Sequence, residues 1–188
     1  MSDKTSLRKQ MKETLSMLSK PAYEDYSYKI AAKLFEEENW IQAKVVGITV
    51  SKAPEVDTYQ IIRKAWELGK QVAVPKCYPV ERKLSFRTLS EFSQLESVYY
   101  GLMEPIVELT SEVPSEEIDL LIVPGAAYTR EGYRLGFGGG YYDRYLTNYF
   151  GKTLSLAFNE QIIPQFPVEE HDIPVSKIIT NLEVIETK

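Results

Sequence analysis

Hydrophobic residues recur at intervals of three or four near the start of the chain, between residues 3 and 19. Side chains at this spacing share one face of a helix, and they are Leu7, Met11, Leu15 and Leu18. A neighbouring stripe of Lys4, Arg8 and Lys12 makes the predicted helix basic. Pro21 suits the first turn of a second helix, which we expect to end near Asn39.

Short apolar runs rich in β-branched residues alternate with helical patterns along the rest of the chain. The predicted strands cover residues 45–50, 71–74, 120–123 and 153–157, and helices are predicted over residues 57–68 and 141–150. Asp57 and Gln60 would cap the first of these helices, and Gly69 would stop it. Strands that alternate with helices predict a largely parallel sheet.

Two further segments complete the predicted fold. Residues 84–88 would add another strand, and the proline-containing residues 99–114 are expected to form an irregular connection. No internal repeat and no linker interrupts the 188 residues. We therefore expect an α/β fold in which residues 1–188 form a single three-layer domain, with a central, largely parallel sheet flanked by helices.

Charge and cysteine content narrow the classes of function. The formal net charge is −5 and no long cluster of Lys and Arg is present, which argues against nucleic-acid binding. Cys77 is the only cysteine, so no internal disulfide can form, and no apolar stretch approaches the roughly 18 to 20 residues that span a membrane. We expect a cytoplasmic protein without membrane or nucleic-acid partners. The sequence does not determine its oligomeric state, for which a monomer is the expectation.

Four of the five residues at positions 136–140, directly before the last predicted helix, are glycines. Pro124-Gly125 ends an apolar strand, and Gly136, Gly138, Gly139 and Gly140 follow about ten residues later. Glycine permits positive φ and lets a ligand approach the backbone closely, so that consecutive backbone N–H groups can point at one anion. The N-terminus of a following helix would add a favourable dipole. The pattern predicts a phosphate-binding loop, although glycines also make plain tight turns.

The two commonest nucleotide motifs are excluded. Tyr141 stands where the dinucleotide fingerprint needs its third glycine, and Leu146 stands where a Walker motif ending at residues 151–153 needs its first. Gly151 is therefore interpreted as a helix stop. Asp143 would lie in the first helical turn, where a carboxylate either binds a magnesium ion that bridges phosphates or merely complements the helix dipole.

Residues 121–125 (LIVPG) and 132–144 (GYRLGFGGGYYDR) closely resemble the signature of the 5-formyltetrahydrofolate cyclo-ligase family, also called 5,10-methenyltetrahydrofolate synthetase. Other landmarks of that family occur in the same order along essentially the whole chain. They are Lys4 with Arg8, Glu55-Val56-Asp57-Thr58, Pro75-Lys76, Gly101-Leu102 with Glu104-Pro105, and His171-Asp172.

The resemblance implies ATP as co-substrate and Mg²⁺ as cofactor. The ATP-binding residues would be Lys4, Arg8, Arg134, Leu135, Gly136, Phe137, Gly138, Gly139, Gly140, Tyr141 and Tyr142, and the magnesium ligands would be Asp143 and Asp172. Taken alone, Lys4 and Arg8 are equally well explained as solvated surface charges. His171 is expected at most to orient Asp172.

The same resemblance assigns the folate to Glu55, Tyr100 and Tyr141. A carboxylate between a strand and a helix suits the N–H donors of a pterin, and a tyrosine can offer it an aromatic face. Without the resemblance, Glu55 would be interpreted as an exposed loop acid and Tyr100 as a core residue. Some relatives carry a cation where this chain has Gly139, so the charge that meets the transferred phosphoryl group must come from elsewhere, with Lys76, Arg134 and Arg144 as candidates.

The implied reaction converts 5-formyltetrahydrofolate and ATP into 5,10-methenyltetrahydrofolate, ADP and phosphate, by phosphorylation of the formyl oxygen. Such chemistry depends on alignment and charge neutralisation and needs no protein nucleophile. Two other classes fit the residues alone. One is an α/β enzyme that acts on a sugar phosphate or a coenzyme A ester with Glu55 as base or nucleophile. The other is a module that binds a nucleotide or folate without turnover.

Overall fold

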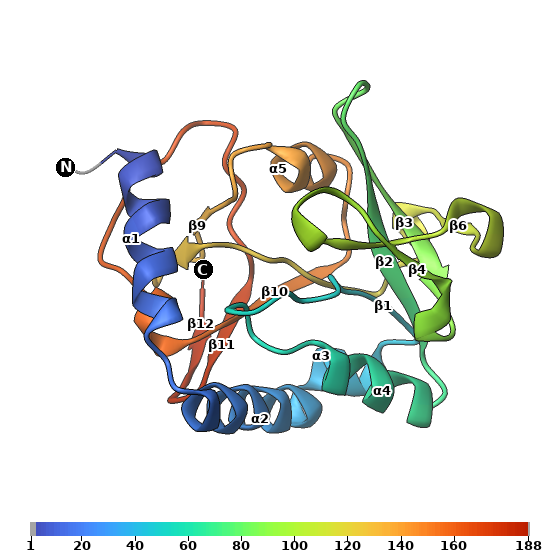
Figure 1. The fold of residues 1–188 in the computed structure, drawn as a ribbon, viewed down its shortest axis with the longest axis horizontal. Coiled ribbons are helices and arrows are strands. Elements are labelled where there is room, and N and C mark those ends of the chain that lie inside the picture. Colours follow the sequence, from blue (N-terminus) through green and yellow to red (C-terminus); the bar gives the residue numbers. More distant parts are fainter. Residues whose placement is uncertain (1–2, 188) are drawn as a thin grey trace.

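The computed structural model describes residues 3–187, which build an eight-stranded sheet with helices on both faces (Figure 1). The order of the strands in the sheet is β12-β11-β10-β7-β1-β2-β3-β6. Their bounds are β1 Val45–Gly47, β2 Gln71–Tyr78, β3 Lys83–Leu89, β6 Glu112–Val113, β7 Leu120–Ile122, β10 Lys152–Ala157, β11 Lys177–Thr180 and β12 Val184–Glu186. Two small hairpins stand apart, β4 (Leu95–Ser97) with β5 (Met103–Pro105), and β8 (Ala127–Tyr128) with β9 (Arg134–Leu135).

The five central strands β11, β10, β7, β1 and β2 run parallel. At the margins, β12 pairs antiparallel with β11, β3 with β2, and β6 with β3. The predicted largely parallel sheet is therefore confirmed. The five predicted strands also exist, although β2 and β3 are longer than expected because they pair along seven residues as one hairpin.

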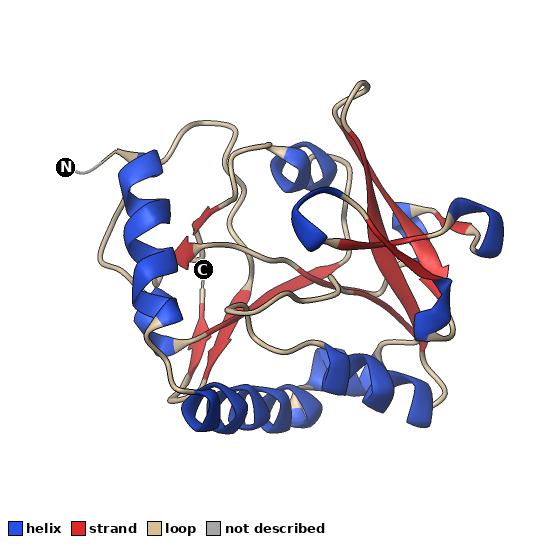
Figure 2. Ribbon diagram, in the orientation of Figure 1, coloured by secondary structure: helices blue, strands red, loops and turns tan. Residues whose placement is uncertain are grey.

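Within residues 3–187, five α-helices accompany the sheet, α1 (Lys4–Ser16), α2 (Lys20–Glu36), α3 (Glu38–Gln42), α4 (Tyr59–Glu67) and α5 (Tyr141–Leu146). Figure 2 shows α2, α3 and α4 in a row along one face, with α5 on the other. Strand side chains alternate between two buried clusters, so that Leu120 and Ile122 join the cluster under α2 and α4 while Leu121 joins the one under α5. The expected three-layer α/β architecture is confirmed.

Local signals place the first helices close to their predicted bounds. Asp3 caps α1 by accepting a hydrogen bond from the Ser6 N–H, and Pro21 lies in the first turn of α2. The second helix does not continue to Asn39, because Glu37 adopts extended backbone (ψ 134°) and a separate short helix, α3, follows.

The stop predicted for α4 is present, but the predicted cap is not, because the N-cap is Thr58 and it makes no side-chain capping hydrogen bond. Asp57 accepts hydrogen bonds from the Tyr59 N–H and from the Gln60 side chain, and Gly69 ends the helix at φ +73°.

Two expectations about irregular segments are wrong. The segment 99–114 contains β5 and β6, because backbone pairing with β4 and β3 orders a stretch that has little strand pattern of its own. Helix α5 ends at Leu146 rather than near residue 150, so Gly151 is not a helix stop. There the buried Tyr149 hydroxyl donates to the carbonyls of Ile118 and Lys152, which turns the chain into β10.

No helix within residues 3–187 combines the length and the apolar character needed to cross a membrane.

Candidate active site

The site lies at the carboxyl ends of the parallel strands. After β1 the chain continues to β2 on one side, whereas β7 pairs with β1 on the other side. Strand order reverses at this point, and open α/β sheets place ligand crevices there because the loops that follow the two strands diverge. The loop after β1 carries Glu55, and the chain after β7 leads through the β8–β9 hairpin to the glycine loop, residues 136–140.

The glycine loop joins β9 to α5 and exposes its middle. Gly138 (φ +106°) and Gly140 (φ +68°) adopt backbone conformations that other residues rarely take, which explains two of the four glycines. Phe137 is 60% exposed. Because α5 has only six residues, any anion bound here depends on the loop amides and on nearby cations more than on a helix dipole.

Arg134 lies beneath the loop with only 3% of its side chain exposed. Its Nη2 donates to Asp143 Oδ1 over 2.7 Å, and its guanidinium carbon lies 5.8 Å from the centre of the Tyr142 ring. Its Nε has no hydrogen-bond partner among residues 3–187. Arg134 therefore connects both ends of the glycine loop and keeps one unused donor there.

The first helix reaches the loop from the side. Arg8 Nε donates to the Gly136 carbonyl over 2.6 Å, across 128 residues of sequence. One turn earlier, Lys4 Nζ lies 3.2 Å from Glu169 Oε1 and 3.6 Å from Asp172 Oδ2. Lys4 and Arg8 are thus contact residues of the site region and not merely solvated surface charges.

Asp172 is held in place by its neighbours. Its Oδ2 accepts the Glu169 N–H at 2.8 Å, and its Oδ1 lies 3.6 Å from His171 Nε2. Both aspartates predicted as magnesium ligands are therefore partly engaged, Asp143 with Arg134 and Asp172 with Lys4. Residues 3–187 contain no cluster of three or more His, Cys, Asp or Glu side chains suited to a metal. One or two carboxylates still fit Mg²⁺, which commonly takes its other ligands from substrate phosphates and water.

Arg144 and Tyr141 close the far side of the loop. Arg144 Nη2 donates to the Gly139 carbonyl at 2.8 Å, and its guanidinium carbon lies 5.2 Å from the centre of the Tyr141 ring. The same side chain donates through Nε to the carbonyl of Arg82, at the tip of the β2–β3 hairpin. These contacts hold the hairpin against the loop.

Glu55 lies in a tight turn after β1. Its Oε2 accepts the Lys52 N–H at 3.0 Å, and its carbonyl accepts the Tyr23 hydroxyl at 2.7 Å. Burial raises the pKa of the Glu55 carboxyl, so it is not an exposed loop acid. Burial also raises the pKa of Tyr142 well above its usual value, and the charge of Glu55 adds to this effect.

Tyr100 is 89% exposed at φ +57°, so its interpretation as a core residue is wrong. The Lys52 side chain donates to the Tyr100 carbonyl, which joins the Glu55 turn to the turn at Tyr99–Gly101. No motif in the sequence distinguishes Lys52 from the other lysines. Its role as a link between two predicted folate residues is visible only in the folded chain.

Lys76 is committed to other partners. Its Nζ lies 2.9 Å from Glu104 Oε1 and 3.9 Å from Glu96 Oε1, and Glu104 Oε2 also accepts the Cys77 N–H. This pair joins β2 to β5. Among the three candidate cations, Arg134 and Arg144 adjoin the glycine loop directly.

Comparison with known proteins shows the family of this chain. The model of the 5-formyltetrahydrofolate cyclo-ligase family matches residues 1–181. A probable 5-formyltetrahydrofolate cyclo-ligase of Caenorhabditis elegans is 30% identical over 97% of this chain and 94% of its own. A 5-formyltetrahydrofolate cyclo-ligase of Escherichia coli K12 is 33% identical over 78% of this chain and 82% of its own.

Solved structures show the same fold. The NMR structure of the Aquifex aeolicus 5,10-methenyltetrahydrofolate synthetase superposes with a TM-score of 0.85 at 30% identity, and covers 98% of this chain and 93% of its own. A Mycoplasma pneumoniae 5,10-methenyltetrahydrofolate synthetase superposes with a TM-score of 0.78 at 22% identity, covering 96% of this chain and 99% of its own.

Proposed function

This chain belongs to the 5-formyltetrahydrofolate cyclo-ligase family, and we propose that it converts 5-formyltetrahydrofolate and ATP into 5,10-methenyltetrahydrofolate, ADP and phosphate in a Mg²⁺-dependent reaction. The observation that carries the proposal is the convergence of Arg8, Arg134 and Arg144 on one glycine loop. Three cationic side chains from different parts of the chain around an exposed, glycine-rich backbone suit a polyanion such as a triphosphate.

The nucleotide would lie with its phosphates on residues 136–140. Arg8 and Lys4 would approach from α1, and Arg134 from below the loop, where its free Nε can donate to a phosphate oxygen after a small movement. These cations would neutralise charge that accumulates as the γ-phosphoryl group moves. Tyr141 and Tyr142 follow the loop directly and would frame its entrance.

Asp143 and Asp172 would hold the magnesium ion. When bound, Mg²⁺ neutralises phosphate charge and orients the β- and γ-phosphates. Both carboxylates are already paired with cations that also adjoin the predicted phosphate site, Arg134 and Lys4. Binding of MgATP would therefore exchange these internal ion pairs for contacts with metal and phosphate, at a modest net electrostatic cost.

The folate would bind at the Glu55 turn and at the turn that contains Tyr100, which the Lys52 side chain joins. Glu55 would accept hydrogen bonds from the pterin amino and ring N–H groups, while Tyr100 and Tyr141 would supply aromatic surface. The formyl oxygen attacks the γ-phosphorus and ADP leaves. N10 then attacks the formyl carbon of the same molecule and releases its proton, and cleavage of the bond to the phosphorylated oxygen expels phosphate and completes the methenyl bridge. Holding the two substrates in line is the main task of the residues.

A single assay tests the proposal. Purified protein is mixed with 5-formyltetrahydrofolate and MgATP, and the methenyl chromophore is followed together with ADP release. We expect both products in equal amounts and none without ATP or Mg²⁺. Turnover of a sugar phosphate or a coenzyme A ester without ATP, or binding without turnover, would instead indicate one of the alternative classes. The single domain, the monomeric state and the cytoplasmic location stay predictions.

A further inference from the structure

A hollow of about 440 Å³ lies between the glycine loop and the tip of the β2–β3 hairpin. Its lining residues are Pro79, Arg82, the glycines at 138–140, Tyr141 and Arg144. No Asp or Glu is among them, and two arginines are, so the fixed charge that faces this hollow is positive. The hollow has the size range of ligand-binding pockets.

Two positions of the glycine loop, Gly139 and Gly140, have no room for a side chain unless a neighbouring group moves. A Cβ at Gly139 would lie 2.7 Å from two ring carbons of Tyr141, and a Cβ at Gly140 would lie 2.7 Å from Arg144 Nη1. Any side chain at either position would have to displace one of these groups. Positive charge in the hollow must therefore come from outside the loop.

Arg144 supplies charge, but its donors are already engaged. Nε donates to the Arg82 carbonyl at 2.9 Å and Nη2 to the Gly139 carbonyl at 2.8 Å, while the guanidinium lies over the Tyr141 ring. Its hydrogen bonds serve to join the hairpin to the loop. Reorienting Arg144 toward a ligand would break that join.

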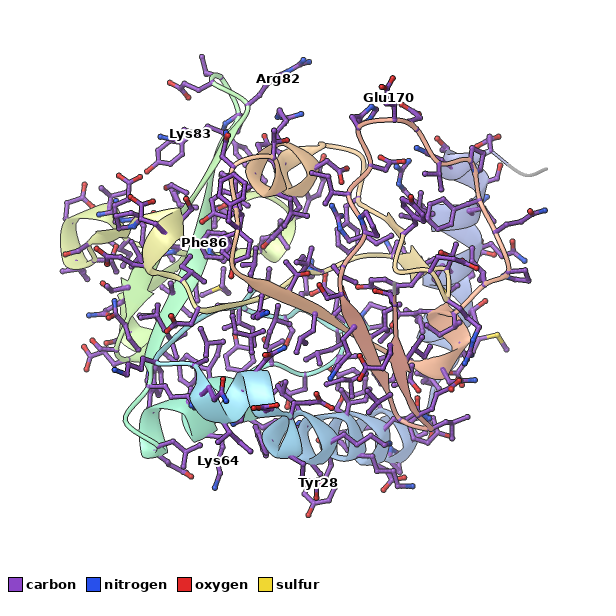
Figure 3. All side chains as sticks on the ribbon, turned by 180° about the vertical axis from the view of Figure 1, so that it is seen from behind. Tyr28, Lys64, Arg82, Lys83, Phe86 and Glu170 are labelled. Atoms are coloured by element: carbon purple, nitrogen blue, oxygen red, sulfur yellow. The ribbon has the colours of Figure 1, made fainter. Side chains whose placement is uncertain are left out.

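The Arg82 side chain, by contrast, makes no hydrogen bond or ion pair with any other part of residues 3–187. Figure 3 shows it extending from the hairpin tip on the side where α5 lies. The backbone of Arg82 is fixed, because φ is +53°, its N–H donates to the Pro79 carbonyl, and its own carbonyl accepts from Arg144. Arg82 thus lines the hollow beside the glycine loop, with a fixed backbone and an exposed guanidinium that has no partner within residues 3–187.

We infer that Arg82 binds the phosphate chain of the nucleotide and provides the cation that the loop lacks. A guanidinium matches phosphate oxygens with two parallel N–H donors, which makes arginine well suited to this role. Arg144 acts as a positioning residue that keeps the hairpin tip, and with it Arg82, against the loop. The inference rests on the proposed function, because it takes the glycine loop to be the phosphate site.

The test compares Arg82→Gly, Arg82→Lys and Lys83→Ala with the wild-type protein. Glycine adopts φ +53° without strain and keeps the carbonyl that Arg144 binds, so Arg82→Gly removes the cation and leaves the hairpin tip intact. Lys83 is the matched control, since it carries the same charge on the same hairpin but does not line this hollow. The probes are Mg²⁺ with the non-hydrolysable analogue adenylyl imidodiphosphate, and adenosine, both measured by calorimetry.

We expect Arg82→Gly to weaken binding of the triphosphate analogue roughly 5- to 30-fold, with adenosine binding unchanged. Arg82→Lys should recover most of the lost affinity, and Lys83→Ala should bind the analogue like wild type. In Arg82→Gly the KM for ATP should rise while the KM for 5-formyltetrahydrofolate stays constant. If Arg82→Gly binds the analogue with wild-type affinity, or if its affinity for adenosine falls as much as its affinity for the analogue, the inference about Arg82 is wrong while the proposed function stands. A wild-type protein that neither binds the analogue nor forms the methenyl product would overturn the proposed function and this inference together.

Discussion

Arg134 Nη2 and Asp143 Oδ1 meet at 2.7 Å although nine positions separate them, and their contact closes the glycine loop at its base. The arginine is almost wholly buried, and its carboxylate partner is partly open to solvent. A cation that binds Asp143 from the solvent side therefore also weakens the ion pair between Asp143 and Arg134. The site is coupled internally, and several substitutions test the coupling.

Asp143→Asn removes the negative charge and keeps an oxygen for Arg134. We predict that turnover at limiting Mg²⁺ falls at least roughly tenfold, because an amide oxygen is a poorer magnesium ligand than a carboxylate. Stability should fall by about 1–3 kcal/mol, since the buried guanidinium loses its counter-charge. Turnover is measured over a magnesium titration and stability by urea unfolding. Near-wild-type turnover at limiting Mg²⁺ would remove Asp143 from the proposed metal site.

Arg8→Met breaks the contact between α1 and the Gly136 carbonyl. We predict an increase of roughly tenfold in the KM for ATP, because one cation and one restraint on the loop are lost. Amide hydrogen exchange in the loop should become faster. Lys12→Met is the matched control, since Lys12 is an exposed cation one turn further along the same helix. If both variants raise the KM equally, general charge and not the Arg8 contact is responsible.

Glu55→Gln should have opposite effects on stability and on folate binding. Burial raises the pKa of the Glu55 carboxyl in the folded protein above its value in the unfolded chain. Its favourable contribution is thus fully present below the unfolded pKa and is lost as pH rises through the folded pKa. The variant should gain stability relative to wild type as pH increases from about 4 to about 7, which thermal unfolding at the two pH values measures.

The same Glu55→Gln variant should bind folate more weakly, with a KM for 5-formyltetrahydrofolate raised roughly 10- to 100-fold by loss of a charged acceptor. Glu24→Gln, at an exposed position on α2, is the control for both measurements. An unchanged folate KM would mean that Glu55 is a buried structural acid, whatever its effect on stability.

Lys52→Met should release the turn that contains Tyr100. The Lys52 side chain contacts the Tyr100 carbonyl, while its backbone N–H donates to Glu55, so one residue positions both predicted folate contacts. We expect the KM for 5-formyltetrahydrofolate to rise roughly 3- to 10-fold and the KM for ATP to stay constant. Lys44→Met, an exposed lysine before β1, is the control. A rise confined to the KM for ATP would place the folate elsewhere.

Much of the fold was predictable because its signals are local. Asp3 and Pro21 at helix starts and Gly69 at a helix end act within one turn, and the apolar runs of β7 and β10 are strand-like on their own. The predictions were wrong where contacts with other parts of the chain determine the local structure. Segment 99–114 gains its strands from partners earlier in the chain, and α5 ends early because Tyr149 bonds across to Ile118.

The sequence by itself determined the α/β class, the presence of a glycine loop that is neither a Walker nor a dinucleotide motif, and the membership of a family through motifs spread along the chain. Only the tertiary structure decided which cations meet that loop. Arg8 reaches it across 128 positions, and Arg82 comes beside it because Arg144 joins the β2–β3 hairpin to Gly139. No local pattern encodes such contacts, since they depend on strand order and on how far a hairpin extends beyond the sheet.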